Sequence, residues 1–222
     1  VLGLAGAKKS TAFSRTHDCI YSFVEWLTAE RRAGEVSMEQ AELSFNTIWE
    51  KRGPTEHGFA ADYRRLASSL IRTLIQFGKS VTFRDVDALI VEFVEGNVVV
   101  EPNEVIERPD GSMTLRKIRT GRKRKDEQDR LEHAVYQLAG EAAYGTQCTV
   151  EVLHLTDGTS TPVELTSRKL KFRRDKIVEM VVSIGNGHFP ASPDQFSCPR
   201  CPHFFHCPSV PVGPLSLVGD ST

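Results

Sequence analysis

The chain has 222 residues, of which 28 are Lys or Arg and 29 are Asp or Glu, so its formal net charge is −1. This balance excludes a globally basic nucleic-acid-binding protein, and any surface for nucleic acid must be local. Apolar residues make up 40% of the chain, which is ordinary for a globular domain. No apolar run reaches the roughly 18 to 20 residues of a membrane-spanning helix, and the start of the chain lacks the features of a signal peptide. We therefore expect a cytoplasmic protein with no membrane partner.

The first third of the chain is predicted to be helical. Apolar residues recur at helical spacing over 8–32, and a further helix is expected over 58–77. Between them, Ser37 heads a Ser-x-x-Gln capping box, which predicts that a helix begins directly after it. The buried stripe of that second helix is expected to comprise Leu43, Ile48 and Trp49.

The hydrophobic period then changes from about 3.6 to 2, which predicts an antiparallel meander. Its strands are expected over 87–94, 97–101 and 112–118. The elements expected after the meander are a helix over 126–144, a strand over 148–155, a short strand over 162–165 and a last helix over 169–184. This order of elements predicts a layered α/β fold.

The most cationic segment of the chain, 116–125, directly follows the third strand. Strand alternation places Lys117 and Arg119 on one face of the sheet and Arg116 on the other. A solvated surface is one interpretation of the segment. Contact with a phosphate backbone is the other, because Arg and Lys side chains beside Gly121 can approach phosphates closely. The candidate nucleic-acid-binding residues are Arg116, Lys117, Arg119, Arg122, Lys123, Arg124 and Lys125.

Three of the five cysteines, Cys198, Cys201 and Cys207, form a C-x2-C-x5-C pattern near the end of the chain. Thiolates at this spacing in a proline-rich segment can converge on one soft metal ion or cluster. A fourth cysteine elsewhere would indicate an iron–sulfur cluster, whereas His203 or His206 would complete a zinc site. Three unliganded thiols are the remaining alternative. The odd number of cysteines argues for a reducing compartment.

Taken in order, these features resemble the nuclease domain of the RecB-type PD-(D/E)xK family, in the version that carries a four-iron, four-sulfur (4Fe-4S) cluster. The resemblance covers the whole chain, and the matching segments are the helix histidine His17, the strand motif 96–99, the strand motif 117–121, the helix start 132–136 and the cysteine tail. It implies a restriction-endonuclease-like core, in which helices flank a central mixed sheet. The implied single domain comprises a helical part (1–78), an α/β core (79–187), a cysteine knot (188–210) and a tail (211–222).

The resemblance also implies a divalent-metal site, and here the sequence departs from the family. The family holds Mg or Mn ions with two strand carboxylates, and a lysine orients the attacking water. In this chain Val99 and Lys117 stand at the carboxylate positions, Arg119 at the lysine position and Glu132 at a glutamine position. Cations where ligands are needed predict that Mg or Mn binding and hydrolysis are lost. Glu101 and Glu104 are the candidates for an offset metal site that would restore hydrolysis.

Three functions therefore remain open. The first is a catalytically degenerate, nuclease-like domain that grips single-stranded or tailed duplex DNA. The Lys-x-Arg-Thr-Gly-Arg variant resembles the C-terminal end of some superfamily-1 helicases of the UvrD and PcrA type, which implies a helicase motor in the same parent protein or complex, a role in DNA repair or recombination, and a bacterial, nucleoid-associated location. The motor's ATPase and the fourth cluster cysteine are then expected upstream of this chain. The second function is an active metal-dependent DNA exonuclease, and the third is a zinc-bound protein-interaction module.

Overall fold

The computed structural model describes residues 10–77, 81–85, 88–188, 193 and 198. Ser10–Val182 form one compact unit, and Val1–Lys9 with Ser183–Thr222 form a second. Each unit is described by itself. In the second unit the described residues comprise the end of a helix and two single positions.

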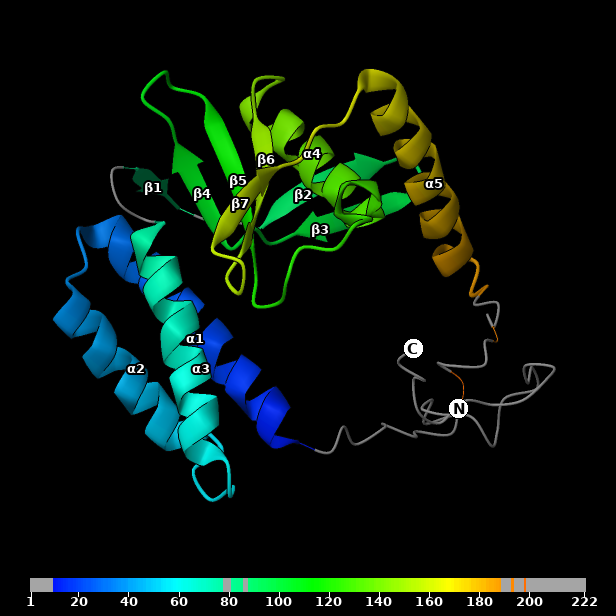
Figure 1. Ribbon diagram of the computed structural model, residues 1–222. Helices are drawn as coiled ribbons and strands as arrows, with labels where there is room; N and C mark the ends of the chain where they lie inside the picture. Colours follow the sequence, from blue (N-terminus) through cyan, green and yellow to red (C-terminus); the bar gives the residue numbers. More distant parts are fainter. Residues whose placement is uncertain (1–9, 78–80, 86–87, 189–192, 194–197, 199–222) are drawn as a thin grey trace. The chain divides into compact units, whose positions relative to one another are not determined.

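Three helices open the first unit, as predicted, and lie together in Figure 1. They are α1 (Ala12–Ala33), α2 (Met38–Arg52) and α3 (Ala60–Gln76). The predicted capping box is present at the start of α2: the Ser37 hydroxyl accepts a hydrogen bond from the Gln40 backbone N–H at 3.1 Å, and the Gln40 side chain accepts one from the Ser37 N–H at 3.0 Å. The predicted stripe of α2 is partly wrong, because Leu43 is 68% exposed. The helix instead buries Ala41, Phe45 and Trp49, which recur every fourth residue.

A five-stranded mixed sheet forms the centre of the unit, in the order β1-β4-β5-β6-β7. Its strands are β1 (Thr82–Arg84), β4 (Glu104–Glu107), β5 (Met113–Arg119), β6 (Thr149–His154) and β7 (Thr159–Pro162). Only the β5–β6 pair is parallel. A separate hairpin consists of β2 (Leu89–Phe93) and β3 (Gly96–Val100).

The predicted meander needs a correction. The strand expected over 97–101 pairs with β2 in the separate hairpin, and β4 takes the place beside β5. The sequence did not indicate β4, because a charged residue stands at each end of a short apolar pair, Val105 and Ile106. β1 was also not predicted.

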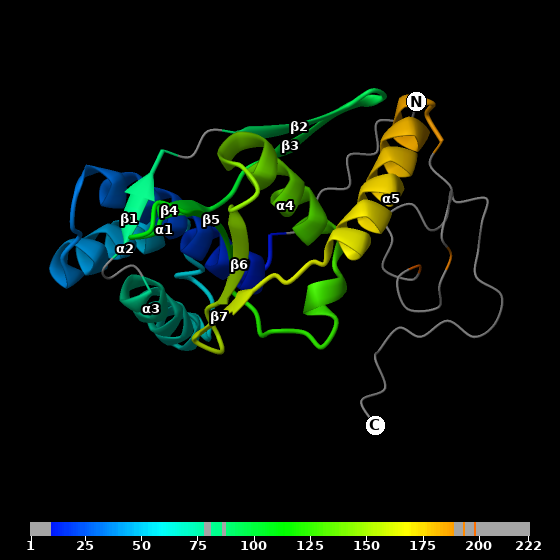
Figure 2. The same ribbon diagram turned by 90° about the horizontal axis from the view of Figure 1, so that it is seen from above.

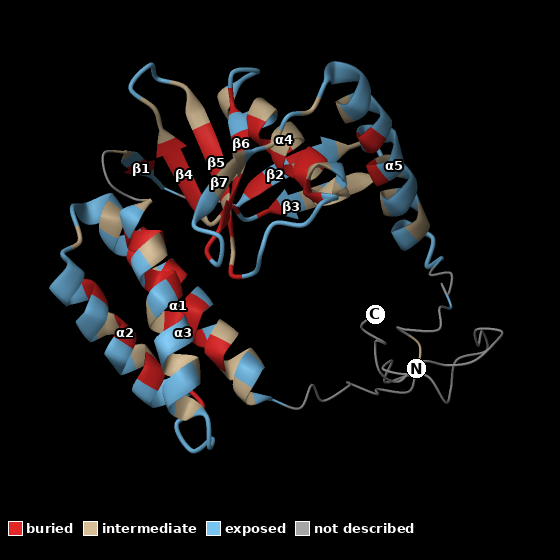
Figure 3. Cartoon of the chain, viewed as in Figure 1, coloured by how far each residue is buried: buried red, intermediate tan, exposed pale blue. Residues whose placement is uncertain are grey.

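Each face of the central sheet carries its own hydrophobic core (Figure 3). On one face α1, α2 and α3 pack with Ile118 of β5 and with Leu153 and Leu155 at the end of β6. On the other face Leu115 and Val150 pack with the β2–β3 hairpin and with α4 (Leu131–Tyr144), which lies beside the hairpin (Figure 2). The predicted fold class, a central mixed sheet flanked by helices, is confirmed.

Two further elements complete the described chain: the one-turn 3-10 helix η1 (Glu127–Asp129) before α4, and α5 (Ser167–Gly185) after β7. Within the described ranges, no helix is both long and apolar enough to cross a bilayer.

Candidate nucleic-acid interface

Strand β5 divides the basic segment between the two faces of the sheet. Arg116 faces the α1–α3 layer, is 3% exposed, and pairs with Glu104 at 2.7 Å and with Glu151. Lys117 and Arg119 face the opposite way, toward α4, as strand alternation predicted. We therefore correct the predicted binding set by removing Arg116, because a buried guanidinium that is held by two carboxylates cannot reach a ligand in solvent.

Three cations converge on one carboxylate at the start of α4. Glu132 lies in the first turn of the helix, and its Oε2 is 2.8 Å from Nη2 of Arg119 and 3.1 Å from Nη2 of Arg130. The ammonium of Lys117 contacts the other oxygen of Glu132. Arg130 is the N-cap residue of α4, so η1 and the helix start bring it to the site. Sequence analysis did not single out Arg130, because the helix was expected over 126–144 and its start at Leu131 was not foreseen.

A second carboxylate, Glu127 in η1, lies deeper. It is 2% exposed, its Oε1 is 3.0 Å from Nε2 of His133, and it is 3.4 Å from Nε of Arg119. Because a carboxylate only accepts hydrogen bonds, His133 donates from Nε2. Burial lowers the pKa of His133, so its ring is neutral at pH 7. Glu127 thus forms an ion pair with the Arg119 guanidinium, and His133 adds no further positive charge.

Lys117 is the titratable cation of the site. Burial is the main cause that lowers its pKa to about 8, and repulsion from Arg119 and Arg130 acts in the same direction. Glu127 acts in the opposite direction. The ammonium also lies 5.1 Å from the ring centroid of Tyr136.

His17 of α1, the helix histidine that was predicted from the resemblance, lies next to the end of β5. Nδ1 of His17 is 2.8 Å from the hydroxyl of Thr120, directly after β5, and the ring lies against Phe13 in a tilted arrangement. Burial lowers the pKa of His17. The structure therefore brings α1 to the Lys-x-Arg-Thr-Gly segment, with the histidine at Thr120.

Val99, which stands at the first carboxylate position by the resemblance, does not lie in the sheet that contains Lys117. It lies in β3, pairs with Ile90, and is 59% exposed. Strand β4 begins at Glu104, opposite Arg116, and directly before it the Asn103 N–H donates a hydrogen bond to the Arg116 carbonyl at 3.1 Å. The Asn103 side chain is engaged with the backbone, since its Oδ1 accepts a hydrogen bond from the Ile118 N–H at 2.7 Å. Asn103 was missed because β4 was missed.

The oxygen donors near β5 do not suit a divalent cation. Glu104, a predicted offset ligand, is fully buried between Arg31 at 2.9 Å and Arg116, so this candidate is withdrawn. Glu101 is exposed, and its backbone carbonyl accepts a hydrogen bond from Tyr136. Across the described part of the chain, no three Asp, Glu, His or Cys side chains are grouped to hold a metal ion. Mg or Mn requires several oxygens in one small sphere, whereas Glu127 and Glu132 already neutralise cations.

The remaining predicted cations lie in the loop between β5 and η1. Arg122, Lys123, Arg124 and Lys125 are all exposed. Asp157 holds the first part of this loop, because it accepts a hydrogen bond from the Lys123 N–H at 2.7 Å and lies 4.0 Å from Nε of Arg122. The loop therefore presents side chains to solvent next to the Lys117–Arg119 face of β5.

The predicted cysteine site falls largely outside the described residues. Cys198 is described and is partly exposed. Cys201, Cys207, His203 and His206 lie outside the described residues. The cluster or zinc site stays a prediction.

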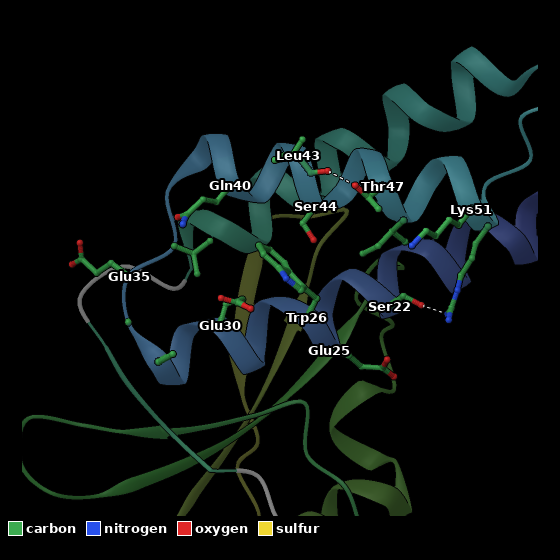
Figure 4. Close-up of a pocket in the computed structure, with 15 residues that line it drawn as sticks. Ser22, Glu25, Trp26, Glu30, Glu35, Gln40, Leu43, Ser44, Thr47 and Lys51 are labelled. Carbon is green, nitrogen blue, oxygen red and sulfur yellow. Dashed lines mark hydrogen bonds between the residues drawn. The ribbon is translucent and has the colours of Figure 1, made fainter.

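A groove of about 800 Å³ lies between α1 and α2, as Figure 4 shows. Its lining combines apolar Trp26 and Leu43 with acidic Glu25 and Glu30 and with Lys51. None of the lining residues belongs to β5, η1 or α4. We therefore treat the cationic face of β5 as the candidate site.

No family model matches the sequence, and no curated protein matches it. The structure is similar to the crystal structure of a "Putative exonuclease" from Eubacterium rectale, with a TM-score of 0.51 and 15% sequence identity. The match covers 90% of this chain and 77% of that chain. At this identity the likeness shows that the two chains share a fold, and it assigns no chemistry to this chain.

Proposed function

We propose that this chain is a degenerate nuclease-fold domain that binds the DNA backbone without cleaving it. The observation that carries the proposal is the convergence of Lys117, Arg119 and Arg130 around Glu132, on the side of β5 that faces α4. By the resemblance to RecB-type nucleases, this strand would carry a metal-binding carboxylate and the catalytic lysine. A cationic site of this kind can pair with phosphate oxygens directly, and guanidinium groups do so with two parallel hydrogen bonds.

The exposed loop 122–125 extends this surface. Its four cations stand one after another beside the strand, and each phosphate that they neutralise releases counterions from DNA. The net charge of −1 argues against binding by the molecule as a whole, so affinity should depend on this local surface and on salt.

Loss of hydrolysis is the second part of the proposal. A metal-dependent nuclease needs at least one ion that bridges the scissile phosphate and carboxylate ligands. Here Glu104 is fully buried between two arginines, and Glu127 and Glu132 each lie against a cation. Exposed Glu101 remains the carboxylate on which the alternative of an active, metal-dependent exonuclease rests.

The proposed setting follows from the sequence resemblance. We propose that the chain accompanies a helicase motor in a DNA repair or recombination assembly. Cys198, Cys201 and Cys207 would bind a 4Fe-4S cluster with a fourth cysteine outside this chain, or zinc with His206. Iron, sulfide and zinc analysis of the purified protein distinguishes these two groups, and an exchange of Cys201 for Ser should lower the content of the group that is found.

The primary test is one gel series with end-labelled single-stranded and tailed duplex DNA in the presence of Mg, Mn or EDTA. Retarded complexes that weaken with salt, with no shortened products under any condition, are expected. Metal-dependent shortening would contradict the proposal. If the change Glu101→Gln abolished such shortening, an offset metal site would be identified.

Removal of two charges from β5 tests the assigned surface. The double variant Lys117→Gln with Arg119→Gln should weaken DNA binding and reduce the slope of log affinity against log salt by about 2, since each lost phosphate contact lowers it by about 1. Gln is preferred to Glu because a new carboxylate beside Glu127 and Glu132 would threaten folding. Affinity is measured by fluorescence anisotropy over a series of salt concentrations.

The matched control removes two exposed cations from the helical layer, Lys51→Gln with Arg65→Gln. Both double variants have the same net charge. Equal losses in the two variants would indicate a non-specific charge effect and would contradict the assignment to β5.

A further inference from the structure

The carboxylate of Glu132 is held as a bound anion would be. Two guanidinium groups approach one of its oxygens, Arg119 at 2.8 Å and Arg130 at 3.1 Å, and the Lys117 ammonium contacts the other. One side chain therefore satisfies three cations from two elements, β5 and the start of α4. This is the coordination that a phosphate group receives from a cluster of Arg and Lys.

The carboxylates of the cluster do not neutralise all of its positive charge, so the cluster can attract a further anion. Lys117, Arg119 and Arg130 face Glu132 and the buried Glu127, and His133 is neutral, so the cluster retains one net positive charge. A deeply buried cluster of this kind would be closed to a ligand from solvent. Here the side chains of the three cations and of Glu132 are between 23% and 31% exposed, so part of each is open to solvent, whereas Oε1 of Glu132 and Nε of Arg119 are buried.

The cost of displacing the carboxylate is small. Ion pairs that are partly open to water contribute little to stability, because water and salt screen them and the side chains lose conformational freedom. Glu132 stands in the first turn of α4, where its side chain can rotate toward solvent without any change in the helix. The Arg119 guanidinium would remain anchored by Glu127 when Glu132 leaves.

We propose that Lys117, Arg119 and Arg130 form a phosphate-binding subsite that Glu132 fills in the free protein, and that a DNA phosphodiester binds there by displacing the Glu132 carboxylate. The inference rests on the proposed function, because it assigns one phosphate of the bound strand to named side chains. Glu132 then acts as an internal competitor that weakens binding. Removal of its charge should strengthen DNA binding, which is the opposite of what the loss of a binding residue does.

The test measures the affinity of the full chain for a fluorescent single-stranded oligonucleotide by anisotropy, at constant pH and salt. Glu132→Gln is expected to bind about three- to tenfold more tightly than the unaltered chain, on the scale at which tenfold corresponds to about 1.4 kcal/mol. Glu132→Asp retains the charge but shortens the side chain, so it should gain affinity as well, although less. The gain should vanish when Lys117→Gln and Arg119→Gln are added.

The control variant is Glu141→Gln on the same helix. Glu141 accepts a hydrogen bond from Gln137, and the substitution changes the net charge by the same amount as Glu132→Gln. Its affinity should stay within about twofold of the unaltered chain, because Glu141 is partly open to solvent and is not among the ion-pair partners of Lys117, Arg119 and Arg130 in the described part of the chain.

The outcomes separate the inference from the function on which it rests. If the unaltered chain binds DNA through Lys117 and Arg119 while Glu132→Gln and Glu132→Asp bind no more tightly, the subsite inference is overturned and the proposed function stands. If neither the unaltered chain nor any variant binds, both are overturned. If Glu132→Gln does not fold, as judged by circular dichroism, the result for Glu132→Asp decides.

Discussion

At the scale of single residues, the site combines one cation that titrates near neutrality with two that do not. Burial and two neighbouring guanidinium groups lower the pKa of Lys117 to about 8, although Glu127 opposes the shift. Arginine guanidinium groups stay charged throughout the same range. Lys117 is therefore protonated for the most part at pH 7 and neutral for the most part at pH 9.

This difference predicts a pH dependence of DNA binding. Affinity should fall as the pH rises from 7 to 9.5, because the ammonium of Lys117 loses its proton within that range while DNA phosphates keep their charge. Anisotropy titrations at constant ionic strength measure the effect. Lys117→Arg, which cannot lose its charge, should flatten the profile. An equal fall in that variant would mean that another group titrates.

At the scale of elements, β4 holds the charge cluster that joins the sheet to the helical layer. Glu104 at its start is fully buried and forms ion pairs with Arg31 of α1 and with Arg116 of β5. Arg116 also pairs with Glu151 of β6, which extends the cluster across three strands. A buried carboxylate of this kind is costly to remove, because its partners are left as unpaired charges.

Glu104→Gln should therefore lower the free energy of unfolding by about 3 kcal/mol, as expected when one partner of a buried ion pair is neutralised. Urea unfolding followed by circular dichroism measures the change. Glu107→Gln is the matched control, because Glu107 lies on the same strand, is 30% exposed in its side chain and pairs with Arg84 near the surface. It should lose no more than about 1 kcal/mol. Similar losses in both variants would refute a special role for Glu104.

The same strand shows where sequence patterns stop being informative. α2 could be predicted because its cap, Ser37 with Gln40, is local, and strand alternation was enough to place Lys117 and Arg119 on one face of the sheet. β4 could not be predicted, because the burial of Glu104 depends on arginines 73 and 12 residues away. The predicted residue set of the site lacked Glu127 and Arg130 for a related reason. Both residues reach the site from a turn, and no periodicity in the sequence specifies the path of that turn.

At the scale of the whole molecule, the helical layer and the sheet share one core in the unit Ser10–Val182. Ile118, Leu153 and Leu155 of the sheet region pack in the same cluster as the buried residues of α1, α2 and α3. Helices whose buried faces depend on a sheet in this way have little independent stability.

We therefore expect the helices and the sheet to unfold together. Both tryptophans of the chain, Trp26 and Trp49, lie in the helical layer, so their fluorescence reports on that layer alone. The fluorescence transition should coincide with the transition of the β-sheet amide band in the infrared during thermal unfolding. Ile118→Ala, which opens a cavity between the two layers, should lower both midpoints by the same amount. Separate midpoints would show that the layers unfold independently.

The alternation of β5 has a practical consequence for any library of variants of this protein. Arg116 and Lys117 are adjacent and both basic, yet one pairs inside the molecule and the other faces the candidate site. A screen that scores cellular abundance should therefore deplete changes at position 116 and accept more of them at 117 and 119, because only Arg116 is itself buried. A screen that scores retention on DNA should deplete all three positions. Comparison of the two scores, position by position along one strand, would separate residues that stabilise the fold from residues that bind DNA.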